Sequence, residues 1–191
     1  MTFKKFAALA ALLMVPGVAE AHPGFHPEGF AAGFVHPFTG LDHLLAMTAV
    51  GFWAATLGNS ARLLVPAAFV SLMVAGALFG MSGLVVPVEQ GIAASVVVLG
   101  LLIAFQVRIP TAAAALLVGA FALFHGHAHG TELPEAADAL SFAIGFVLAT
   151  MALHALGLGF GVLAPLARHD GLSRLAGGAI ASCGIALAFL S

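Results

Sequence analysis

The chain has 191 residues, of which 62% are hydrophobic and only 7% are charged. A soluble domain usually carries about a quarter charged residues, so this composition predicts an integral membrane protein. The formal net charge of −2 and the lack of a basic patch exclude a nucleic-acid partner. The single cysteine, Cys183, excludes an internal disulfide and a cysteine-rich metal site.

The first 21 residues have the pattern of a secretory signal peptide. Lys4 and Lys5 form a positive start, an apolar stretch follows, and residues 19–21 read Ala-Glu-Ala, a small-x-small cleavage pattern. The apolar stretch is far shorter than the roughly 20 residues that cross a bilayer. We therefore predict a signal peptide at residues 1–21 and one transmembrane domain at residues 22–191.

Cleavage would make His22 the mature N-terminus. Its free amine and imidazole could then chelate a metal together, with His26 nearby. The alternative is that His22 and His26 form only a polar leader, and the sequence does not decide between the two.

Six apolar segments follow the leader, and they predict an all-α fold, a polytopic bundle of six transmembrane helices. They are Phe38–Leu57, Leu63–Ser82, Ile92–Gln106, Pro110–His125, Ala139–Leu158 and Leu175–Leu190. Small residues predict close helix packing at Gly76 and Gly80, and again at Gly157, Gly159 and Gly161. We interpret the 16 phenylalanines as ordinary lipid-facing or core residues.

The loop charges predict an orientation. With the mature N-terminus in the periplasm, all basic residues after the leader fall in cytoplasmic loops, as the positive-inside rule requires. These are Arg62, Arg108, Arg168 and Arg174. The predicted location is therefore the bacterial cytoplasmic (inner) membrane.

A first cluster of metal-binding side chain types lies at the start of the first segment. His36 and His43 are seven residues apart, which would place them on one face of a continuous helix, with Asp42 beside His43. Asp42 could ligate a metal or orient the His43 ring. A carboxylate within a bilayer is costly unless it is paired, so we expect a bound cation or a partner there.

A second cluster closes the fourth segment. His125 and His129 are four residues apart and should share a helix face, whereas His127 should point away from both. Gly126 and Gly130 predict that this helix end unwinds where it lines a cavity.

Further candidate ligands lie outside these two clusters. Glu132 follows the second cluster, Glu89 precedes the third segment, and His154 lies inside the fifth. Met47 and Met151 carry soft thioethers that suit nickel or copper better than magnesium or calcium.

At these residues the chain resembles the HupE/UreJ family of bacterial nickel and cobalt permeases. The first family motif, His-Pro-x-x-Gly-x-Asp-His-x-x-Ala-Met, is matched by His36, Pro37, Gly40, Asp42, His43, Ala46 and Met47. The second motif is matched by the run from Phe124 to Glu132. The resemblance extends over the whole chain.

The resemblance implies a permease, not an enzyme, that takes up nickel or else cobalt for hydrogenase, urease or cobalamin maturation. The ligands that it implies are His36, Asp42, His43, His125, His127, His129 and Glu132. Five further candidates have weaker support: His22, His26, Met47, Glu89 and His154. The metal would be cargo, with no tightly bound cofactor, and the sequence contains no ATP-binding Gly-x-x-x-x-Gly-Lys-Ser/Thr loop.

Two other functions remain open. A membrane-embedded metallohydrolase would use the same side chains to hold zinc and activate a water. A metal sensor or periplasmic buffer would use only the histidine-rich ends, and would tolerate Asp42→Asn. The sequence leaves the oligomeric state open.

Overall fold

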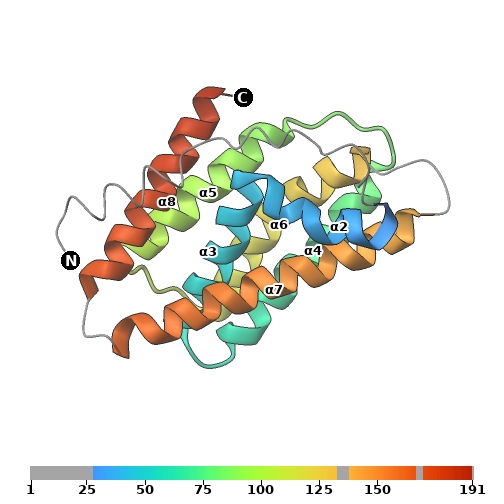
Figure 1. Ribbon diagram of the computed structural model, residues 1–191. Helices are drawn as coiled ribbons and strands as arrows, with labels where there is room; N and C mark the ends of the chain where they lie inside the picture. Colours follow the sequence, from blue (N-terminus) through green and yellow to red (C-terminus); the bar gives the residue numbers. More distant parts are fainter. Residues whose placement is uncertain (1–27, 133–137, 167–169, 191) are drawn as a thin grey trace, which may run out of the picture.

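The computed structural model describes residues 28–132, 138–166 and 170–190, and within them the fold is entirely helical (Figure 1). The helices are α2 (Gly29–Thr39), α3 (Leu41–Leu57), α4 (Ala61–Gly80), α5 (Val88–Ala104), α6 (Thr111–Glu132), α7 (Ala139–Leu166) and α8 (Asp170–Leu190). The predicted signal peptide, with His22 and His26, lies outside the described residues.

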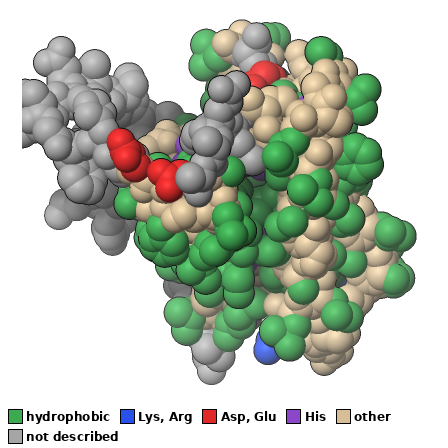
Figure 2. Space-filling model, turned by 90° about the vertical axis from the view of Figure 1, so that its right-hand side faces the viewer, with side chains coloured by type: hydrophobic (Ala, Val, Ile, Leu, Met, Phe, Trp, Pro, Cys, Tyr) green, Lys and Arg blue, Asp and Glu red, His purple; other side chains and the backbone are tan. Residues whose placement is uncertain are grey.

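Several of the described helices have the length and composition of membrane-crossing segments. Four are long and apolar enough to cross a bilayer: Ala61–Gly80, Thr111–Thr131, Ala139–Ala164 and Gly171–Leu190. Two shorter apolar helices, α3 and α5, have 17 residues each. At about 1.5 Å per residue they extend about 25 Å, slightly less than the hydrocarbon core. Large apolar side chains cover the surface (Figure 2), including Leu63 and Leu116, which are 77% and 73% exposed. An apolar surface of this kind indicates a membrane protein.

Charged residues segregate to the two ends of the bundle. Glu28, Glu89 and Asp138 precede α2, α5 and α7 or lie in their first turns, at what we call the acidic end. Arg62 lies in the first turn of α4 and Arg174 in the second turn of α8, at the opposite, arginine end, where α8 also begins with Asp170. Figure 2 shows the same separation on one face of the molecule. Arg62 and Arg174 thus lie at one end of the bundle, as the sequence predicted.

Glycine residues allow two pairs of helices to approach each other closely. A Cβ atom at Gly76, Gly80, Gly126 or Gly130 would overlap a backbone carbonyl oxygen of the facing helix, so α4 and α6 lie backbone to backbone. The α3–α7 pair has the same construction at Gly51 and Gly157. The predicted packing roles of Gly76, Gly80, Gly157 and Gly161 are confirmed. Gly159 is different, because a Cβ there would meet nothing within 4 Å.

Two local predictions are wrong, and both errors concern glycine. The first segment is not one helix from Phe38, because Gly40 adopts an extended conformation (φ −96°, ψ 119°) that separates α2 from α3. The second histidine cluster does not unwind, because α6 continues through it to Glu132. Gly126 and Gly130 instead allow α6 to lie close to α4, and α6 remains helical through both residues.

Candidate metal centre

The break at Gly40 brings His36 back toward the start of α3. The His36 and His43 rings lie edge to face with centroids 6.3 Å apart, although a helix end separates them in the chain. The α2 helix is held along α7 by contacts at Gly33 and Gly145. His36 therefore approaches His43 through a broken helix, not along one helix face as the spacing predicted.

Asp42 and His43 form an orienting pair in the first turn of α3. Asp42 Oδ1 accepts the backbone N–H of His43 at 2.8 Å and lies 2.9 Å from the ring Nδ1. Because an ionised carboxylate can only accept, His43 Nδ1–H is the donor, and the lone pair of His43 lies on Nε2. A carboxylate that fixes a histidine tautomer in this way is a recurring feature of metal sites.

Gly40 makes room for this pair. A Cβ at Gly40 would lie 2.7 Å from Asp42 Oδ1 and 3.2 Å from His43 Nδ1. Both distances are shorter than ordinary contacts, so a side chain here would displace the Asp42 carboxylate. The glycine of the His-Pro-x-x-Gly-x-Asp-His pattern thus protects the geometry of its own aspartate and histidine.

His129 of α6 faces His43 directly. The two Nε2 atoms are 2.8 Å apart and buried, and the ring centroids are 4.6 Å apart. Since His43 keeps its Nδ1 proton for Asp42, His129 Nε2–H donates to the His43 lone pair. Two nitrogens that bind one metal at 2.0–2.1 Å are separated by about 3 Å. An ion could therefore replace this shared proton after a small separation of the rings.

His125 lies one helical turn from His129 and is completely buried. Its Nδ1–H donates to the Phe121 carbonyl at 3.0 Å, which leaves the lone pair on Nε2. Among the described residues, His125 Nε2 has no hydrogen-bond partner. The ring centroid is 5.1 Å from that of His43, so a second unprotonated nitrogen lies next to the first.

A cavity of 270 Å³ opens at the acidic end over these rings. His36, Asp42, His43 and His129 line it together with Glu89 of α5. The structure thus brings four of the stronger sequence candidates and one weaker candidate, Glu89, from different helices to one mouth. Glu89 is exposed, so its carboxylate can meet an ion before the buried histidines do.

Several predicted residues do not join this group. In the described part of the chain, no ring contact links His127 to the other histidines, and Met47 is packed in the apolar core. His154 is buried farther along the bundle, beside Phe69. The side chain of Glu132 lies outside the described residues, as do His22 and His26.

The sequence interpretation did not identify two phenylalanines of α7 that pack against the histidine rings. Phe146 lies with its ring centroid 4.2 Å from His129, and Phe142 lies 5.7 Å from His36. These phenylalanines are more than ordinary lipid-facing or core residues, because they exclude water from one side of the histidines. The sequence did show that Phe142 and Phe146 are four residues apart, which places both rings on one face of a helix.

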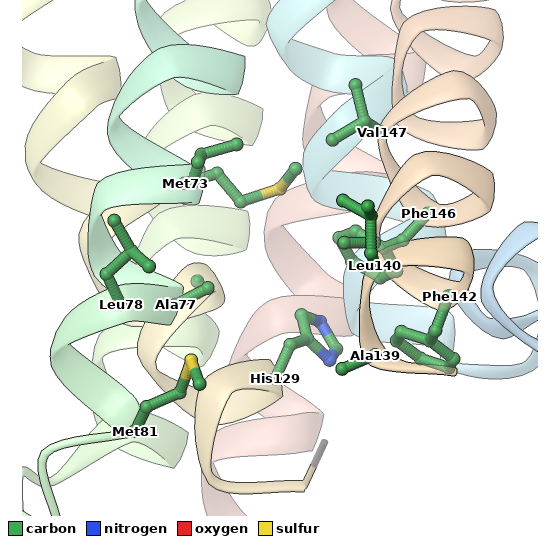
Figure 3. A pocket seen from close by; sticks show the side chains of 13 residues that line it. Met73, Ala77, Leu78, Met81, His129, Ala139, Leu140, Phe142, Phe146 and Val147 are labelled. Carbon is green, nitrogen blue, oxygen red and sulfur yellow. The ribbon is translucent and has the colours of Figure 1, made fainter. Parts of the chain in front are cut away.

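A second pocket, of 320 Å³, lies between α4 and α7 (Figure 3). His129 points toward it, but its other lining residues are apolar, including Met73, Met81 and Phe146. An apolar pocket offers an ion no replacement for its hydration shell. We therefore place the approach of an ion at the polar mouth beside Glu89.

The described side chains do not form a complete metal site. No group of three or more His, Cys, Asp or Glu residues among them already has metal-binding geometry. The arrangement provides two oriented histidine nitrogens, a further histidine, and two carboxylates at the mouth.

Gly40→Ala should weaken metal binding without unfolding the protein. The new methyl group would displace Asp42 Oδ1, while the φ and ψ of Gly40 are open to alanine. We expect a loss of about tenfold in nickel affinity, the lower range for a damaged orienting partner. Equilibrium nickel binding to purified protein measures this change. Gly178→Ala, where a Cβ meets nothing within 4 Å, is the control, and equal affinity in both variants would contradict the role of Gly40.

Comparison with known proteins decides the family. The family model described as HupE / UreJ protein matches residues 10–187. The chain belongs to the HupE/UreJ family. It is similar to Protein HupE of Rhizobium leguminosarum bv. viciae, with 50% identity over 188 residues, covering 98% of each chain. No solved structure matches the chain.

Membership in the HupE/UreJ family confirms the resemblance seen in the two histidine motifs. The family is of the nickel/cobalt transport type, which is consistent with metal uptake and indicates a transporter rather than an enzyme. Together with the apolar helices, it indicates a membrane protein.

Proposed function

We propose that this HupE/UreJ protein takes up a divalent transition metal across the bacterial cytoplasmic membrane. Nickel is the first candidate and cobalt the second. In this proposal the signal peptide is removed, the mature N-terminus is periplasmic, and α3 to α8 cross the bilayer. The metal is cargo, and it would supply hydrogenase, urease or cobalamin maturation.

One observation carries the proposal: the 2.8 Å approach of His43 Nε2 and His129 Nε2, below a mouth lined by Asp42 and Glu89. Imidazole nitrogens suit nickel and cobalt, and carboxylates attract the cation. The mouth lies at the acidic end, which is the periplasmic side in the proposed orientation. His36 and His125 extend the series of nitrogen donors on both sides of the pair.

The other predicted ligands enter the proposal on weaker grounds. Glu132 follows the second cluster on α6 and, with His22 and His26, would collect scarce metal outside the mouth. His127 is retained from the family motif alone. Met47 lies one turn below His43, where a thioether could assist a soft metal.

The membrane potential can drive this transport without ATP. It contributes about 2.3 kcal/mol per charge at 100 mV, or about 4.6 kcal/mol for a divalent cation. That free energy supports roughly a thousand-fold accumulation. Removal of the ion by cytoplasmic metalloproteins would increase the gradient further.

The test is nickel and cobalt influx into proteoliposomes that contain the full protein. With an inside-negative potassium diffusion potential, influx should exceed that of protein-free liposomes at least about tenfold, and should fall when the potential is removed. An excess of cobalt should compete with radioactive nickel. No influx of either metal would contradict the proposal. Metal binding without influx would then favour a sensor or buffer, and zinc-dependent hydrolysis would favour the enzyme alternative.

A further inference from the structure

His154 of α7 is a buried polar side chain that the fold does not use. It is 3% exposed, and neither ring nitrogen has a hydrogen-bond partner among the described residues. Burial of an imidazole without hydrogen bonds costs free energy that a leucine would not cost. An ionisable side chain kept in an apolar segment at such a cost suggests a ligand.

The position of His154 continues the histidine series toward the arginine end. The Phe69 ring lies between His125 and His154, with centroid distances of 5.5 Å and 5.1 Å. One turn closer to the acidic end, the Thr150 hydroxyl faces the Met73 sulfur at 4.0 Å. The order from the mouth is therefore His43 and His129, then His125, then Phe69, and then His154.

A groove begins beside His154, the last residue of this series. It has a volume of 510 Å³, lies between α4 and α7, and extends to Arg62 at the arginine end. His154 lines the groove together with Ser71 and Met151. Met151 precedes His154 by three residues on α7, so the thioether and the imidazole lie on neighbouring positions of the helix surface. Most side chains that line the groove are apolar, and both ring nitrogens of His154 are buried beside it. The His154 imidazole and the Met151 thioether are of the donor types that borderline divalent metals accept.

We propose that His154 is an inner binding position for the transported divalent metal, separated from the outer histidines by the Phe69 ring. The inference rests on the proposed uptake function and adds the second position to it. An ion leaves His125 when the Phe69 ring turns aside and binds His154, with Met151 available beside it. Because Phe69 is fully buried, its ring closes the path between the two positions at rest.

His154→Leu tests the proposal, and His154→Gln is a second variant in case the first does not fold. In proteoliposomes we expect the maximal nickel influx to fall at least about tenfold, while the half-saturating concentration stays near that of wild type, because the outer cluster is intact. The melting temperature should be unchanged or higher, because the imidazole has no hydrogen bond to lose. Saturating nickel should bind with one ion fewer per chain than in wild type.

Ser95→Ala is the control, since Ser95 is equally buried but donates within its own helix to the Ile92 carbonyl. It should keep wild-type influx and wild-type binding. Wild-type influx and stoichiometry in both His154 variants would overturn the inner position while leaving uptake intact. A lower melting temperature with wild-type stoichiometry would overturn it in favour of a structural role. If wild type carries no metal but still binds one ion more than His154→Leu, uptake fails and the inner position stands.

Discussion

Asp42→Asn should reduce nickel uptake by about 10- to 100-fold at an equal amount of protein in the membrane. The carboxylate has two functions in the structure: it lines the mouth, and it accepts the Nδ1 proton of His43 at 2.9 Å. Asparagine can still accept that proton, so the His43 orientation and the fold should survive. What is lost is the negative charge that attracts a divalent cation. The measurement is the initial rate of radioactive nickel uptake by cells, normalised to the amount of protein.

The control for this experiment is Asp138→Asn, which removes a carboxylate from the same end of the bundle. Asp138 is exposed at the start of α7 and is not part of the cavity lining. We expect its uptake to stay within about twofold of wild type, as for a surface charge screened by salt. Wild-type uptake in Asp42→Asn would reject Asp42 as a ligand or orienting residue, and would support a sensor or buffer that uses only the histidine-rich ends.

Gly157→Ala and Gly159→Ala should change stability in opposite directions. A Cβ at Gly157 would overlap the Thr48 carbonyl oxygen, so α3 and α7 would have to move apart. Overpacking of this kind typically costs about 1–3 kcal/mol, and more where backbone must shift. At Gly159 a Cβ meets open space, so alanine should stabilise the helix by about 0.5–1 kcal/mol. Thermal unfolding in detergent micelles measures both changes.

The Gly157→Ala and Gly159→Ala variants also test whether the packing of α3 against α7 affects transport. In the same α3–α7 contact, the backbone carbonyl oxygen of His154 lies against Gly51 and leaves no room for a side chain there. Separation of α3 from α7 should therefore displace His43 relative to His154 and reduce uptake in Gly157→Ala. Gly159→Ala should keep wild-type uptake. Equal stability of the two alanine variants would show that the α3–α7 contact is looser than the structure has it.

The amino-acid sequence determined the class of the molecule and the type of its chemistry. Low charge and long apolar runs predict helices in a membrane. In a helix, every backbone N–H and C=O group finds its hydrogen-bond partner within its own segment, which the bilayer requires. The histidines, Asp42 and Glu89 could be singled out as candidate metal ligands because few other side chains of an apolar chain bind borderline metals. The motif around His36, Asp42 and His43 also indicated the family, which the comparisons confirmed.

The tertiary structure decided which donors meet and which way their lone pairs point. Helical spacing could relate His125 to His129, but it could not place either against His43, because that contact depends on the register of α6 against α3. Gly40 was part of the motif, yet its break in the helix follows from its backbone conformation and from the Asp42 carboxylate beside it. The sequence did not indicate a role for Phe69. Its ring contacts two histidines only because α4, α6 and α7 pack together, and the sequence of α4 alone does not show that packing. Contacts across helices are set by backbone approach at the packing glycines, which spacing along a single helix does not encode.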